Sequence, residues 1–248
     1  MIFDDKGTPL TLRESGGTTG STFPYSIPAG GVFVFQTDGS PAALRVGWVK
    51  LTPNADNSAP VGAGVFSYSP AGILVTESGI PSAIPTTDAR IYVDKSDGHD
   101  TGLAIANPGG SAGSVVLEAF ENNGSTRAGN GQAVLNIAPG GHSARFVGQL
   151  IGGLPDGFTG VVRISSATPF VALTLRSLYN SRGDFLVTAF PIADANQPAP
   201  GPILFPQIAD GGGYTTQFIF ISATGSASIT VNLLGHDGSP LSAGEVSR

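Results

Sequence analysis

The stretch PTTDARIYVDKSDGHDTGLAIANPGGSAGSVVLEAFENNG, residues 85–124, returns later in the chain as PAPGPILFPQIADGGGYTTQFIFISATGSASITVNLLGHDG, residues 198–238. The two stretches keep their apolar positions and turn residues in register, at an offset of about 114 residues. Chance similarity between Gly-, Ser- and Ala-rich segments is the alternative, and the matched apolar register argues against it. Self-similarity of this kind indicates a structural unit that the chain uses more than once.

A second set of matches joins the beginning of the chain to its middle. Residues 44–46 (LRV) match 162–164 (VRI), and the order of the matches is kept while the offset drifts between about 109 and 118 residues. The other matched pairs are 1–7 with 118–124, 27–31 with 137–141, 60–63 with 169–172, and 73–76 with 185–188. Insertions in loops explain such a drift.

These matches predict three parts. The N-terminal part, 1–84, is the back of one repeat unit; the middle unit, 85–197, is complete; the C-terminal part, 198–248, is the front of another unit. The N-terminal and C-terminal parts overlap by about one hairpin, MIFDDKGTPL at 1–10 against NLLGHDGSPL at 232–241.

Within the middle unit, short β-type runs alternate with turn residues. Asn122-Asn123-Gly124 is a hairpin signal, and 142–150 is the one stretch where one or two helical turns are expected. We expect strands at 90–93, 102–107, 114–120, 132–137, 160–165, 170–175 and 184–190. This density predicts an all-β fold of tandem immunoglobulin-like or fibronectin-like β-sandwich units with little helix.

Three motifs carry a resemblance to a known group of proteins: LAIAN at 103–107, APGG at 138–141 and FTGVVRI at 158–164. With them the chain resembles the Ig-like tandem repeats of bacterial extracellular and surface proteins. The resemblance implies a secreted or surface-displayed module that spaces, adheres or assembles, and it implies no catalytic residues. The Cys…Trp…Cys hallmark of true immunoglobulin domains is absent.

Composition and charge exclude several functions. The chain has 248 residues, 12 Lys and Arg, 18 Asp and Glu and a net charge of -6, and the basic residues are scattered. Nucleic acid or an anionic membrane surface needs a clustered basic face, so neither is an expected partner. No apolar run approaches the length of a membrane-spanning helix.

The chain has no Cys, which favours an exported protein and an extracellular or cell-surface location. The first five residues carry neither the basic nor the apolar segment of a signal peptide, so we expect any targeting segment to lie outside this sequence.

Few residues suggest a chemical site. Asp94, Asp97 and Asp100 surround a Gly turn and are candidates for calcium ligands, with turn-capping aspartates as the alternative. Trp48, the one Trp, is either buried against a sandwich core or an exposed platform for a sugar ring. No His recurs between the repeats, and no nucleophile motif is present, so we expect no enzyme and no obligatory cofactor.

The incomplete ends leave three alternatives open. The two parts complete each other within one chain, or between chains in a head-to-tail fibre, or they belong to neighbouring repeats of a longer array. A non-catalytic structural module that self-associates is therefore the expected function. The alternative is a carbohydrate- or surface-binding adhesion module with glycan partners.

Overall fold

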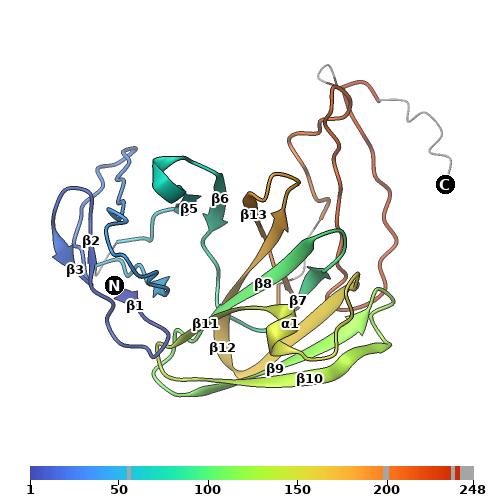
Figure 1. Cartoon of the computed structure of the whole chain (residues 1–248), viewed down its shortest axis with the longest axis horizontal. Helices are drawn as coiled ribbons and strands as arrows, with labels where there is room; N and C mark the ends of the chain where they lie inside the picture. The colour runs from blue at the N-terminus through green and yellow to red at the C-terminus, as the bar shows by residue number, and fades with distance from the viewer. Residues whose placement is uncertain (55–56, 198–200, 236–237, 241–248) are drawn as a thin grey trace.

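The computed structural model describes residues 1–54, 57–197, 201–235 and 238–240. Its architecture is nearly all β, which confirms the predicted all-β class (Figure 1). The largest part of the structure is a sandwich of two antiparallel sheets, which spans Thr86 to Asp194. Its strands are β7 (Thr86–Asp94), β8 (His99–Ala106), β9 (Gly113–Glu121), β10 (Arg127–Ile137), β11 (His142–Phe146), β12 (Thr159–Tyr179), β13 (Phe185–Phe190) and β14 (Ala193–Asp194).

One long strand belongs to both sheets of the sandwich. The first half of β12 pairs with β7 and β9, in the sheet order β10-β9-β12-β7-β14. Its second half pairs with β8 and β13, and β11 extends that sheet beyond β8. The two sheets are therefore tied together by a continuous backbone.

The sequence predicts two separate strands, at 160–165 and 170–175, where the structure has the single strand β12. The pairing of β12 with β7 shifts register between Ser165 and Phe170, around Pro169. Proline has no N–H to donate to a ladder, but it does not prevent an extended backbone. The chain therefore stays extended at Pro169 while it passes from one sheet to the other.

The expected helical turns at 142–150 are present only in part. Residues His142–Phe146 form β11, and a single turn of helix, α1, spans Val147–Leu150. The one turn of α1 agrees with the expectation of one or two turns within 142–150, and β11 pairs along its whole length with β8. Tertiary pairing of this kind overrides the weak local preference of a short segment.

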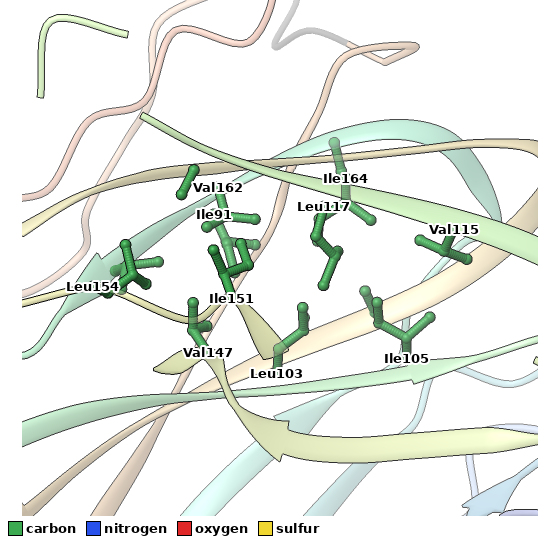
Figure 2. Packing of buried hydrophobic residues seen from close by; sticks show 14 of the residues in the cluster. Ile91, Leu103, Ile105, Val115, Leu117, Val147, Ile151, Leu154, Val162 and Ile164 are labelled. Atoms are coloured by element: carbon green, nitrogen blue, oxygen red, sulfur yellow. The ribbon is translucent and has the colours of Figure 1, made fainter. Parts of the chain in front are cut away.

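A single apolar core fills the space between the two sheets. Figure 2 shows side chains from β7, β9 and β12 meeting side chains from β8 and α1. Ile91, Leu117 and Ile164 are buried in one sheet, and Leu103 and Ile105 face them from the other. Alternate residues along each strand point inward, as the period of two in the sequence requires.

The N-terminal part carries three small antiparallel pairs. Their strands are β1 (Ile2–Phe3) with β4 (Trp48–Val49), β2 (Leu12–Arg13) with β3 (Thr19–Gly20), and β5 (Ala63–Tyr68) with β6 (Thr76–Pro81). A single 3-10 turn, η1 (Pro70–Gly72), joins β5 to β6. Most apolar side chains of this part are exposed.

The C-terminal part contains no strand among its described residues, 201–235 and 238–240. Isolated bridges join Gly211 to Tyr214 and Leu234 to Pro240, and the Arg90 side chain donates to the Ala223 carbonyl at 3.1 Å. Part of the predicted hairpin at 232–241 lies outside the described residues. Figure 1 shows the N-terminal and C-terminal parts on opposite sides of the molecule, with the sandwich between them. No helix among the described residues has the length and apolar character needed to cross a bilayer.

Candidate functional site

The turn between β7 and β8 holds the three candidate calcium ligands, and Asp94 is fully engaged by protein groups. One carboxylate oxygen of Asp94 accepts from Arg176 Nη2 at 2.7 Å and Nε at 3.0 Å, and the other accepts from the Ser96 hydroxyl at 2.6 Å. Burial alone would raise the pKa of Asp94. The hydrogen bonds from Ser96 and the ion pair with Arg176 outweigh burial and hold this pKa below its ordinary value.

The other two aspartates serve the turn itself. Asp97 has a φ of 51° beside Gly98 at 79°, and Asp100 accepts the Thr101 N–H at 2.8 Å. Asp tolerates this left-handed backbone and caps nearby amides. In the described part of the chain, no group of three or more His, Asp or Glu side chains is placed to hold a metal ion. The structure therefore does not bring Asp94, Asp97 and Asp100 together as a ligand set.

Trp48 fastens the N-terminal part to the sandwich. Phe3 stacks on the indole with ring centroids 5.2 Å apart, and the indole N–H donates to the Gly140 carbonyl at 2.7 Å. Nearby, Asp5 Oδ1 lies 2.8 Å from His142 Nδ1. With one face covered and its N–H engaged, the half-buried Trp48 is a poor platform for a sugar ring.

Glycine at position 7 permits this docking. Gly7 has a φ of 79°, and a Cβ at this position would collide with the Pro139 carbonyl oxygen. The backbone of the N-terminal hairpin therefore lies directly against the turn between β10 and β11, an approach that only glycine allows.

A shallow hollow of about 630 Å³ lies between β5 and the rim of the sandwich. It combines aromatic side chains with titratable ones on the turn after β7. Its lining includes Tyr68, Lys95, His99, Asp100, Tyr179 and Phe185. Tyr179 packs against Phe185 with ring centroids 5.2 Å apart and remains largely exposed.

The most unusual surface of the molecule is the apolar face of the N-terminal part. Leu44 is 86% exposed, whereas Val162, its match in the middle unit, is 0% exposed. Val61 is fully exposed, whereas its match, Phe170, is 1% exposed. Positions that form the core of the middle unit are therefore in solvent in the N-terminal part.

The C-terminal part presents the same contrast. Val231 is 51% exposed and corresponds to Leu117, which is 0% exposed; the exposed Ile229 corresponds to the buried Val115. The described residues 201–235 pair with no strand of the N-terminal part. We call Leu44, Val46 and Val61 the N-terminal face, and Ile229, Val231 and Leu233 the C-terminal face.

The sequence matches between the end parts and the middle unit include the segments that carry these faces, but they did not identify the faces as a site. The alignment of the repeats could have identified the faces. An apolar residue that aligns with a core position needs other side chains to cover it, and an incomplete unit does not supply them. The hollow had no comparable signal, since Tyr68 and Tyr179 are distant in sequence and meet only through folding.

Comparison with protein-family models, curated proteins and solved structures finds no match to this chain.

Proposed function

We propose that this chain is a non-catalytic, extracellular structural module of tandem β-sandwich units that assembles head to tail. The observation that carries the proposal is the exposure of core-equivalent side chains on the N-terminal and C-terminal faces, for which Leu44 and Val231 are the clearest cases. Exposed apolar patches of this kind mark sites of association. The absence of Cys agrees with an exported protein.

Head-to-tail growth follows from the nature of the two faces. The N-terminal face repeats the back of a unit and the C-terminal face repeats its front, so the two faces are complementary to each other and not to themselves. An interface between two different surfaces leaves one free surface at each end of the assembly. Each chain added to the assembly therefore creates the site for the next one.

Light scattering across a wide concentration range, with electron microscopy of the same samples, tests the proposal. We expect the mass to grow with concentration from the 25.0 kDa chain into linear assemblies. Leu44→Asp or Val231→Asp, each placing a charge on one face, should abolish this growth. The matched control is Val134→Asp, at an exposed position on the sandwich, which should assemble as the wild type does. A monomer at all concentrations would overturn the proposal.

The hollow supports a second candidate function, glycan-binding adhesion. Exposed tyrosines beside hydrogen-bonding groups such as Asp100 and His99 are suited to a ring with hydroxyl groups. Calorimetric titration with soluble oligosaccharides would show saturable binding that Tyr179→Ala weakens and that Leu44→Asp leaves unchanged. Equal binding by wild type and Tyr179→Ala would remove this site from consideration.

A further inference from the structure

The middle unit shows how the front and the back of a unit pair. In the antiparallel ladder of β12 with β9, Val162 lies opposite Ala119, Arg163 opposite Glu118, and Ile164 opposite Leu117. The back strand of this ladder, at 162–164, has its match at 44–46 in the N-terminal part. The front strand, at 117–119, has its match at 231–233 in the C-terminal part. Met1 and Ile2 also match 118–119, but they pair with Lys50 and Val49 and leave 44–46 without a strand partner.

We infer that residues 44–46 of one chain pair with residues 231–233 of a second copy, in the register of β12 with β9. This inference rests on the proposed function and specifies its interface. It places Leu44 opposite Leu233, Arg45 opposite Asn232, and Val46 opposite Val231. The first and third pairs are apolar on both sides, and the second is polar on both sides.

The alternation of these pairs fixes the register. In the middle unit the apolar members of the ladder are buried, and Arg163 lies on the outer face with Nη1 3.8 Å from Glu118 Oε2. The same arrangement would bury Leu44 and Val46 and leave Arg45 and Asn232 in solvent. A slip of one residue would turn the apolar set outward, so a single register is favoured.

A second, independent observation links the same two parts of the chain. In the middle unit the buried Asp94 of β7 forms an ion pair with the half-buried Arg176 of β12. The match of 97–98 with 210–211 places Gln207 at the position of Asp94, and the match of 60–63 with 169–172 places Ser67 at the position of Arg176. Both residues are neutral. Replacement of only one partner would leave a buried charge unpaired. The joint replacement is the pattern expected if positions 67 and 207 meet in one completed unit.

The partner is a second copy because one chain cannot bring its own faces together in this structure. The two parts lie on opposite sides of the sandwich (Figure 1). The N-terminal part is held on its side by the Trp48 and Asp5 contacts with the turn after β10.

Disulfide trapping tests the register directly, because the chain has no cysteine of its own. Arg45→Cys combined with Asn232→Cys places two thiols on the outer face at directly opposed positions, within disulfide reach. The matched control combines Arg45→Cys with Ser226→Cys, six residues along the same segment and out of reach. Both full-length variants are oxidised under assembling conditions and separated by non-reducing gel electrophoresis.

We expect a ladder of covalent multimers from the first variant, about tenfold more abundant than from the control. If both variants assemble by light scattering but cross-link equally, the register is wrong and the proposed function stands. If the first variant yields only an intrachain disulfide in a monomer, the second copy is the wrong partner. If wild-type chains do not assemble, the proposed function itself fails.

Discussion

At the scale of single residues, Asp94 and Arg176 show how the sandwich compensates a buried charge with an ion pair. Asp94 is buried, and its carboxylate is satisfied by Arg176 and Ser96. The sequence pointed to a calcium ligand or a turn cap at this position. The structure shows the turn cap, in which the Ser96 N–H donates to Asp94 Oδ1 at 3.0 Å, and adds an ion pair with a residue 82 positions away, a partner that local spacing does not reveal.

The single variants Asp94→Gln and Arg176→Ser should each reduce the free energy of unfolding by about 1–3 kcal/mol, because each leaves its partner's charge unpaired. The double variant copies the pair Gln207 and Ser67 of the incomplete parts. It should recover at least about 1 kcal/mol relative to the sum of the single losses. Urea unfolding of the three variants measures this coupling, and strictly additive losses would contradict it.

The same pair predicts a dependence on pH. The pKa of Asp94 in the folded chain lies below its ordinary value of 3.8, so the unfolded chain binds this proton more tightly. The stabilisation is therefore complete above that ordinary value and is lost as the pH falls through the folded pKa. As the pH falls below about 4, the wild type should lose stability more steeply than the double variant. Parallel curves of unfolding free energy against pH would show that Asp94 contributes nothing.

At the scale of elements, the sequence located most strands of the sandwich, because turn residues separate runs with a period of two. It divided β12 at Pro169, since a single sequence does not show that a strand can change sheets there. It also predicted no strand at β11, whose state depends on pairing with β8. These errors concern long-range pairing, which local pattern does not encode.

The first half of β12 depends on glycine at position 160. A Cβ there would collide with the Phe120 carbonyl oxygen and the Phe158 ring. Gly160→Ala should therefore reduce the free energy of unfolding by about 1–3 kcal/mol. Gly110→Ala, where a Cβ would meet open space, is the control and should change stability by less than about 0.5 kcal/mol. Equal urea midpoints for the two variants would contradict this packing.

At the scale of the whole molecule, one sandwich has a buried core, whereas Leu44 and Val231, which match core positions of that sandwich in sequence, are exposed. The sequence predicts the repeat, and the contrast in exposure between Leu44 and Val162 required the structure. The faces are candidates for association because a part of a sandwich cannot cover its own inner surface.

Complementation between two defective chains tests the polarity of the assembly. Leu44→Asp retains a C-terminal face, and Val231→Asp retains an N-terminal face. Each variant alone should stay at 25.0 kDa, whereas their equimolar mixture should form a species of twice that mass and stop growing. Sedimentation velocity resolves the two species. A mixture that remains monomeric, or one that grows without limit, would contradict head-to-tail polarity.

Hydrogen exchange of the two faces as a function of protein concentration tests the central claim most directly. We expect peptides covering 44–46 and 229–233 to exchange rapidly in dilute solution and to become protected as concentration rises. Peptides covering 115–119 and 162–164, already within the sandwich, should remain protected throughout. Rapid exchange at both faces at every concentration would contradict the claim that a second copy covers them.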